Sequence, residues 1–473
     1  MFFTDPHLTY VPYPRFSGYI KGVFRGGPIT IGVSDHPNIC LVHCHDLGRY
    51  LGCYDFDVDT PRIDSLASDG AVFENAFATA PQCSPSRASL HTGRHPHENG
   101  LIGLAHEEPT LNDDERLLVE YLSAAGYETH LFGLQHVTEH PDQLGFDELH
   151  SERHLSPDVP PSVHETDRAR EVSERFADCL GDGDLGDPFF ASIGFFELHR
   201  LEDDGQFRFA DDRYEPADPE AVETLPYLPD EPGVRRDLAD AQGMVRAIDR
   251  GVGRVLDALE DATIREETLV IFTTEHGLAM PRAKGSVYDP GIEIALLASL
   301  PGTIEPGTRH DEMISNVDVL PTLLDLIEEE VPGQVSGRSF LPLLRGKEYD
   351  TRERLFAGMT WHDAYNPVRT IRTRRFKYVR SFWQLPDVYL PHDVGHSPAG
   401  EEVRDEFGQL DRPYEELYDL DADPHERENI AGEAEYAGTT ERLREELQEW
   451  MEATDDPLLS GPVPPSDFEA MMA

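Results

Sequence analysis

Short apolar segments alternate with segments of helical period along most of the chain, and this alternation constrains the fold more than any other feature. Residues 38–43 are apolar almost throughout, which is typical of a parallel strand buried on both faces. Thr60-Pro61 then begins a helix that Thr60 can cap and that Gly70 ends. A strand followed by a helix is the first unit of an α/β fold.

The alternation continues downstream of this first unit. Further expected strands are 129–132, 189–196 and 269–273, and further expected helices are 117–125 and 244–259. Residues 296–300 and 317–327 close the large domain. Residues 201–231 are rich in Asp, Glu and Pro without a clear period, so we expect an irregular surface excursion near the functional site. The pattern predicts a mostly parallel sheet with helices on both faces.

The pattern changes after about Arg345. Residues 368–371 and 376–379 alternate like a hairpin, and Leu443, Leu447, Trp450 and Met451 mark an amphipathic helix. A chain of 473 residues is long enough for a large domain and a smaller one. We therefore predict a leader over residues 1–35, an α/β catalytic domain over 36–345 and an α+β subdomain over 346–473.

The formal net charge of −51 is spread along the whole chain, and Lys21, Lys284, Lys347 and Lys377 are its lysines. Such a surface suits high salt, where self-repulsion is screened, so we infer a halophilic source. It repels nucleic acid and anionic membranes. No segment reaches the roughly 18 apolar residues of a membrane span, and Met1–Gly27 lacks the apolar core of a signal peptide, so we expect a cytoplasmic protein.

The five cysteines are an odd number in a long chain, which argues against a disulfide framework. Cys40 and Cys44 could pair on a zinc ion, but their position on a probable strand favours two buried thiols.

Acidic and imidazole side chains follow four of the expected strands. They are His45 and Asp46, His136, Glu197 and His199, and Glu275 and His276. Ligands of open parallel sheets bind beyond the carboxyl ends of the strands, where these groups would meet. An oxygen-rich set with imidazoles suits a divalent cation and favours calcium or magnesium over zinc. The alternative is a buried salt-bridge network without a metal.

Residues 81–94, Pro-Gln-Cys-Ser-Pro-Ser-Arg-Ala-Ser-Leu-His-Thr-Gly-Arg, form the most specific segment. Pro85 fits the first turn of a helix and Gly93 its end, so Cys83 lies at a helix N-terminus, where the backbone favours anions. Arg87 and Arg94 add positive charge.

This segment resembles the signature of the sulfatase family, C-x-P-S-R followed by T-G-R. The resemblance extends to Pro37-Asn38, Thr60-Pro61, Pro188-Phe-Phe190, residues 253–257, 317–321, 376–378 and 416–420. It implies an alkaline-phosphatase-like α/β core with a smaller C-terminal domain. It also implies a bound Ca²⁺, with Mg²⁺ as the alternative, and oxidation of Cys83 to formylglycine by a separate maturing enzyme.

The resemblance also assigns roles to individual residues. The implied metal ligands are Asp46, the modified Cys83, Glu275 and His276, with His45 as a further candidate. Arg87 would hold the modified residue, and His136, His199 and Lys284 would bind sulfate oxygens or protonate the leaving group. A hydrated aldehyde offers one hydroxyl to attack sulfur and a second whose collapse expels sulfate.

Three positions depart from the family pattern. His45 stands where the family has the first residue of Asp-Asp, and Glu275 stands where it has Asp. Leu134 replaces the lysine of the family's G-K-x-H motif. We expect a changed sulfate affinity or metal preference.

Residues 275–291 and 96–100 are most similar to the sulfamidase (N-sulfoglucosamine sulfohydrolase) branch. The predicted activity is therefore hydrolysis of sulfate esters or sulfamates on a sulfated sugar. One alternative is a phosphodiesterase or phosphonate monoester hydrolase with the same nucleophile. The other is a non-catalytic anion-binding relative in which Cys83 stays a thiol. The sequence leaves the oligomeric state open.

Overall fold

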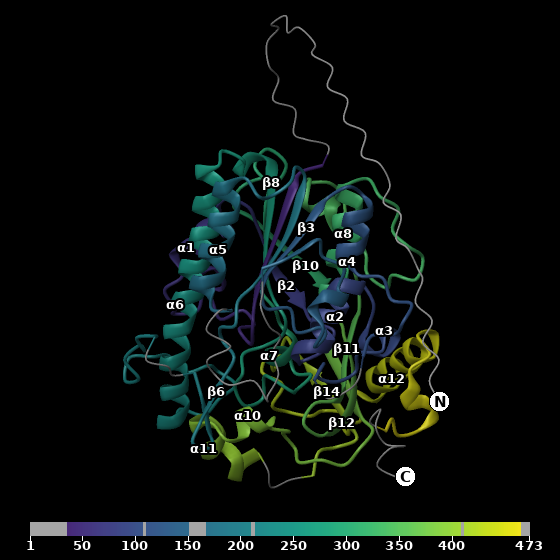
Figure 1. The fold of residues 1–473 in the computed structure, drawn as a ribbon. Helices are drawn as coiled ribbons and strands as arrows, with labels where there is room; N and C mark the ends of the chain where they lie inside the picture. Colours follow the sequence, from purple (N-terminus) through teal and green to yellow (C-terminus); the bar gives the residue numbers. More distant parts are fainter. Residues whose placement is uncertain (1–35, 107–109, 151–166, 210–212, 408–410, 465–473) are drawn as a thin grey trace, which may run out of the picture. The chain divides into compact units, whose positions relative to one another are not determined.

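The computed structural model describes residues 36–106, 110–150, 167–209, 213–407 and 411–464. Its largest element is an eight-stranded sheet with the strand order β10-β2-β9-β8-β1-β5-β3-β4 (Figure 1). The strands are β1 (Asn38–Cys44), β2 (Ala71–Phe77), β3 (Glu128–Gly133), β4 (Glu148–Leu149), β5 (Phe189–Gly194), β8 (Thr268–Thr274), β9 (Leu296–Ser299) and β10 (Thr308–Ser315). β9 runs antiparallel to β2 and β8, and the other pairs are parallel. The predicted mostly parallel sheet is confirmed.

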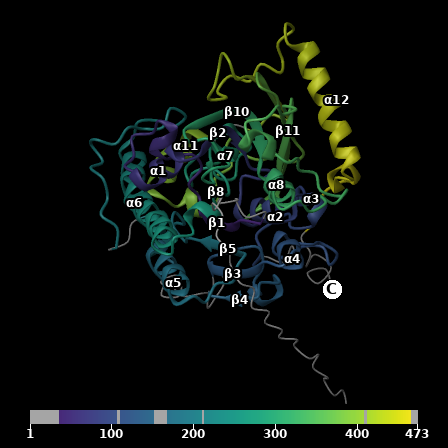
Figure 2. The same cartoon turned by 90° about the horizontal axis from the view of Figure 1, so that it is seen from above.

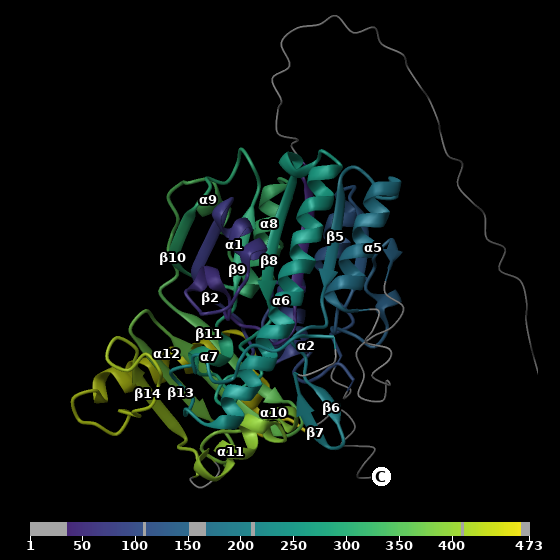
Figure 3. The ribbon, with the colours of Figure 1, turned by 90° about the vertical axis from the view of Figure 1, so that its left-hand side faces the viewer.

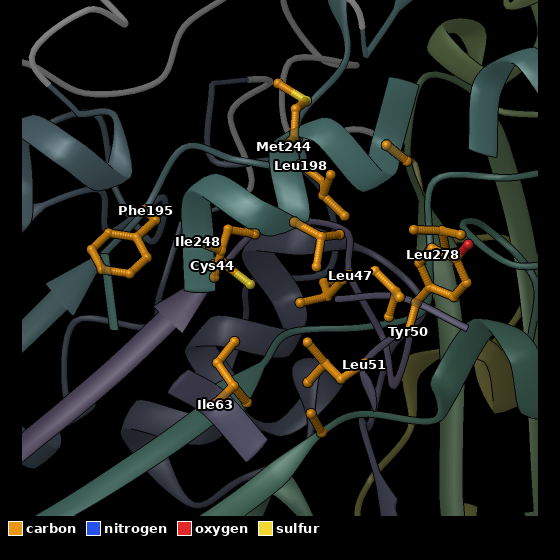
Figure 4. Packing of buried hydrophobic residues seen from close by; sticks show 14 of the residues in the cluster. Cys44, Leu47, Tyr50, Leu51, Ile63, Phe195, Leu198, Met244, Ile248 and Leu278 are labelled. Atoms are coloured by element: carbon orange, nitrogen blue, oxygen red, sulfur yellow. The ribbon is translucent and has the colours of Figure 1, made fainter. Parts of the chain in front are cut away.

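Helices cover both faces of this sheet (Figure 2). One face carries α1 (Pro61–Ser68), α5 (Ala169–Asp182) and α6 (Pro232–Asp261). The other carries α2 (Cys83–Thr92), α4 (Leu118–Ala124), α8 (Val319–Leu326) and α9 (Leu341–Leu344). Strand β1 shows why its sequence is apolar throughout: Val42 packs into the core on the first face and Leu41 into the core on the second. Figure 4 shows the first core, where Cys44, Leu51 and Ile248 pack together.

The cap of α1 differs from the prediction. The Thr60 side chain makes no capping bond, because its hydroxyl accepts from the backbone N–H of Gly52 and donates to Asp64. Asp249 of α6 instead accepts from the N–H groups of Arg62 and Ile63. The helix therefore takes its cap from a residue distant in sequence, which no local pattern can reveal.

The segment 201–231 is more ordered than predicted. Strands β6 (Leu201–Asp203) and β7 (Gln206–Arg208) form a hairpin, and Phe209 and Leu225 are buried in the core. The following helix, α6, begins at Pro232 instead of near Met244. Residues 210–212 of this segment lie outside the described residues.

The C-terminal part contains a four-stranded antiparallel sheet (Figure 3). Its strands are β11 (Leu355–Trp361), β12 (Tyr365–Arg372), β13 (Phe376–Ser381) and β14 (Glu415–Asp419), and β12 and β13 confirm the predicted hairpin. The predicted amphipathic helix is present as α12 (Ala437–Ala453), and its Leu443, Leu447 and Met451 pack on this sheet. Short helices complete the chain: α3 (Pro96–Asn99), α7 (Asp289–Ile292), α10 (His392–Gly395) and α11 (Pro398–Phe407).

Phe77 at the end of β2 and Met313 of β10 pack against Leu355 and Ala357 of β11, so the two sheets share a small apolar core.

The boundary at residues 345/346 stays a prediction, and the leader 1–35 lies outside the described residues. All five cysteines are free, and Cys40 and Cys44 are buried thiols as expected. None of the helices in the described ranges has the length and apolar composition that a bilayer crossing requires.

Candidate active site

Three chain segments bring acidic, imidazole and thiol groups together at the carboxyl ends of β1 and β8. His45 and Asp46 follow β1, Glu275 and His276 follow β8, and Cys83 is the first residue of α2. All five side chains are buried. Because β1 and β8 are paired in parallel, their ends lie side by side and deliver these groups to one place.

Cys83 lies in the middle of this cluster. Its Sγ is 3.8 Å from Oδ1 of Asp46 and 3.5 Å from Nε2 of His276. Burial raises the pKa of the Cys83 thiol to about 12, and the negative charge of Glu275 acts in the same direction. The unmodified thiol is therefore neutral at physiological pH and is a poor nucleophile.

Arg87, one helical turn after Cys83, fixes Glu275 in place. Its Nε donates to Oε2 of Glu275, Nη2 donates to the carbonyl oxygen of Cys44 at 3.1 Å, and Nη1 lies 2.6 Å from Nδ1 of His43. Burial alone would raise the pKa of Glu275, but the Arg87 guanidinium and His45 hold it well below its usual range. Arg94 does not share this role, because it lies past the other end of α2 and pairs with Glu115.

Lys284 joins the cluster to the C-terminal part of the chain. Its Nζ donates to Oδ2 of Asp46 at 3.0 Å and to Oδ2 of Asp393, in α10, at 2.8 Å. Burial would lower the pKa of Lys284, but the two carboxylates hold it well above its usual value. Sequence reasoning missed Asp393, because an isolated Asp in a polar segment carries no local signal.

Imidazole rings surround the remaining side of the cluster. The ring centroid of His45 is 5.4 Å from that of His136 and 5.2 Å from that of His199. Nε2 of His45 and both ring nitrogens of His136 have no hydrogen-bond partner among the described residues. Burial is the main cause that lowers the pKa of all three rings, for His45 to about 4.

Leu134 and Glu197, two positions that the sequence analysis singled out, lie outside the cluster. Leu134, in place of the family's lysine, packs in an apolar cluster with Phe196. Glu197, predicted among the strand-end groups, turns away and accepts from the N–H of Ala169 and the hydroxyl of Tyr214. The predicted convergence therefore holds for His45, Asp46, His136, His199, Glu275 and His276 but not for Glu197.

The cluster has the composition of a cation site. His45, Asp46, Cys83 and Glu275 each offer a ligand atom within 4.8 Å of the others, and so do His45, Cys83 and His136. The same carboxylates also form ion pairs with Arg87 and Lys284, as the alternative of a salt-bridge network required. The orphaned Nε2 of His45 shows that these pairs leave buried polar atoms unsatisfied, which a bound cation or anion would relieve.

The mostly parallel sheet, with strand-end donors beside the N-terminus of α2, has the alkaline-phosphatase-like fold. Residues 37–329 match the family model described as Sulfatase. Residues 275–409 match the one described as N-sulphoglucosamine sulphohydrolase, C-terminal. The chain belongs to the sulfatase family and is a sulfuric ester hydrolase, which confirms the family predicted from the C-x-P-S-R signature.

One curated relative supports this membership, and two solved structures share the fold. The chain is 30% identical to human N-sulphoglucosamine sulphohydrolase, over 90% of this chain and 92% of that protein. A protein solved in complex with its substrate D-glucosamine-2-N,6-O-disulfate shares the fold, with a TM-score of 0.67 and 21% identity over 90% of this chain and 99% of that one. So does the phosphonate monoester hydrolase of Agrobacterium radiobacter, with a TM-score of 0.66 and 20% identity over 89% and 96% of the two chains.

Proposed function

We propose that this sulfatase removes sulfate from an N- or O-sulfated sugar after a maturing enzyme has oxidised Cys83 to formylglycine. The observation that carries the proposal is the position of Cys83, buried at the start of α2 with its Sγ 3.5 Å from His276 and 3.8 Å from Asp46. The choice of a sugar rests on the similarity to human N-sulphoglucosamine sulphohydrolase.

A divalent cation beside Cys83 would be held by Asp46, Glu275 and the modified Cys83, with His45 as a further ligand. His276, whose Nε2 lies 3.5 Å from Sγ of Cys83, would complete this set. When bound, the cation supplies Lewis acidity, and formylglycine supplies, as its hydrate, a hydroxyl nucleophile and a second hydroxyl that releases sulfate. Calcium or magnesium is the ion that the family resemblance predicts.

The protein's own side chains position the sulfate group and balance its charge. The protonated ammonium group of Lys284 lies next to Asp46, where it can donate a hydrogen bond to a sulfate oxygen. His136 is buried with both ring nitrogens unpartnered among the described residues, so the nitrogen that carries the proton can donate to a second sulfate oxygen. Arg87 binds no substrate in this arrangement, because its three nitrogens hold Glu275, His43 and Cys44.

His199 is the group best placed to protonate the leaving oxygen or nitrogen. Its Nδ1 lies 2.7 Å from the carbonyl oxygen of Arg200, which can only accept, so Nδ1 carries a proton. Nε2 is then the nitrogen that exchanges a proton with the substrate. Burial and the nearby Lys284 lower the pKa of His199, and an anionic sulfate group bound beside the ring would raise it again.

Two measurements on protein made in its own host test the proposal. Peptide mass spectrometry across residues 81–94 should find Cys83 lighter by about 18 Da, the loss expected when CH₂SH becomes an aldehyde. The same preparation should release sulfate from N-sulfated or 6-O-sulfated glucosamine, and Cys83→Ser should not, because a serine alcohol cannot expel the sulfate it accepts.

The alternatives give different results in the same experiment. Faster turnover of a phosphonate monoester or a phosphodiester than of any sulfated sugar would move the assignment to phosphorus esters. An unmodified Cys83 without turnover of either substrate class would indicate a non-catalytic anion-binding protein.

A further inference from the structure

Each carboxylate of the cluster directs one oxygen to a buried basic side chain and the other to the imidazole rings. Oδ2 of Asp46 accepts from Lys284 at 3.0 Å, and Oε2 of Glu275 accepts from Nε of Arg87. The oxygens that face the cluster are Oδ1 of Asp46, 3.0 Å from Nε2 of His276, and Oε1 of Glu275, 3.3 Å from the same nitrogen. Asp46 and Glu275 together therefore supply two oxygens.

Imidazole nitrogens supply the other donors. Nδ1 of His276 lies 2.9 Å from the carbonyl oxygen of Gly277, which can only accept, so Nδ1 carries a proton. Nε2, 3.0 Å from Oδ1 of Asp46, is the nitrogen that would bind a cation once the cation displaces its proton. His45 is fully buried, and its Nδ1 lies 2.6 Å from Oε1 of Glu275.

The two ion pairs also reduce the negative charge that a cation meets. Arg87 and Lys284 each place a positive charge against a cluster carboxylate, and both are buried. A hard cation such as Ca²⁺ is held by charge and by six to eight oxygen ligands. This site offers two carboxylate oxygens, and Arg87 and Lys284 offset part of their negative charge, whereas imidazole donors suit zinc.

We infer that the cluster binds Zn²⁺ in preference to Ca²⁺ or Mg²⁺, with His45 as the ligand that determines the preference. The inference rests on the proposed function, which places a divalent cation at these residues. It assigns a chemical consequence to the histidine that stands where the family pattern has an aspartate.

Competition among metals tests this directly. Matured, metal-stripped enzyme is dialysed against equal concentrations of Ca²⁺, Mg²⁺, Mn²⁺ and Zn²⁺, and the bound metal is measured by elemental analysis. We expect zinc to be retained over calcium. His45→Asp should lower the ratio of zinc to calcium by at least about tenfold, because loss of even an outer partner of a metal ligand costs 10–100-fold in affinity.

Two further variants control for other zinc-binding groups. His140→Asp makes the same chemical change at an exposed histidine of the same chain and should leave the ratio unchanged. Cys83→Ala removes the thiol and should keep the preference for zinc, so a residual thiolate cannot be its cause. Circular dichroism of each variant establishes that it is folded.

Retention of calcium by the wild type, or a ratio that His45→Asp leaves unchanged, overturns the inference. That result remains distinguishable from failure of the proposed function, because formylglycine content and sulfate release are measured on the same preparation. A calcium-loaded enzyme with formylglycine and turnover would refute the metal preference alone.

Discussion

Replacement of Arg200 by methionine should destabilise the fold around the active site more than almost any other single change. Arg200 and Asp237 are both fully buried and form an ion pair, with Nη2 of Arg200 2.8 Å from Oδ2 of Asp237. Arg200 also donates twice to the carbonyl oxygen of Ala279, at 3.0 and 2.7 Å. It thus ties the segment after His199 to α6 and to the segment that leads to Lys284.

The magnitude follows from what the substitution leaves behind. Removing one partner of a buried ion pair costs about 3–5 kcal/mol, because the other charge stays buried without compensation. The unpaired carbonyl of Ala279 adds about 1–3 kcal/mol. The sum, about 4–8 kcal/mol, is a large part of the roughly 5–15 kcal/mol that stabilises a typical folded protein. Urea unfolding, followed by near-ultraviolet circular dichroism, should show a much lower midpoint for Arg200→Met.

The double variant Arg200→Met/Asp237→Leu separates this reasoning from a simple loss of packing. Buried ion pairs replaced on both sides by apolar residues are often close to neutral in stability. The double variant should therefore recover at least half of the stability that Arg200→Met loses. If the two substitutions instead destabilise additively, the ion pair is not the cause and the reasoning is refuted.

Four other outcomes are expected. Gly194→Ala should destabilise the protein by about 1–3 kcal/mol, because the added Cβ would collide with the carbonyl oxygen of Leu134 and lie 2.5 Å from Cε1 of His43. It should also reduce turnover, because Nδ1 of His43 contacts Arg87. Urea unfolding measures the first effect and sulfate release the second. Burial would raise the pKa of Asp393, but Lys284 lowers it to about 2 against a usual 3.8, so its stabilising effect is present above about pH 4 and is lost as the pH falls through 2. The stability gap between wild type and Asp393→Asn should accordingly shrink from pH 7 to pH 2, and a constant gap would contradict the assignment. His136→Ala should lower kcat for sulfate release by about 10²–10³-fold, the usual cost of losing one donor to a developing charge. With a net charge of −51, the thermal midpoint should rise as KCl is added up to molar concentrations, and a flat dependence would argue against the predicted adaptation to salt.

Much of the fold could be predicted from local sequence signals. Strand β1 is buried on both faces, and a continuous apolar run such as residues 38–43 is the signal that this environment leaves. The sequence did not predict strand β2, because Glu74-Asn75 interrupts its apolar run. It did not predict helix α5 either, because acidic residues surround the apolar positions of that helix. The cap of α1 by Asp249 depends on tertiary structure, which local patterns do not contain.

The site was predictable to the extent that its residues follow strands or a known signature. Asp46, Glu275 and His276 follow strands, and Cys83 and Arg87 belong to the signature, so the sequence alone indicates them as candidates. Asp393 was not, because its importance comes from a contact with Lys284 across 109 positions of sequence. The occupation of one oxygen on each carboxylate by Arg87 and Lys284 is likewise a matter of geometry and could only be seen in the structure.

The bond between Lys284 and Asp393 bears on how such an enzyme can change during evolution. Every proposed metal donor precedes residue 345, yet a partner of the proposed sulfate-binding lysine lies after it. Arg372 and Lys377 of the C-terminal sheet likewise hold Asp289, five residues after Lys284. A gene fusion that exchanged the C-terminal segment for an unrelated one would keep the proposed metal donors. It would remove Asp393 from Lys284 and both basic partners from Asp289. The segments before and after residue 345 are therefore expected to be inherited together and to diverge together.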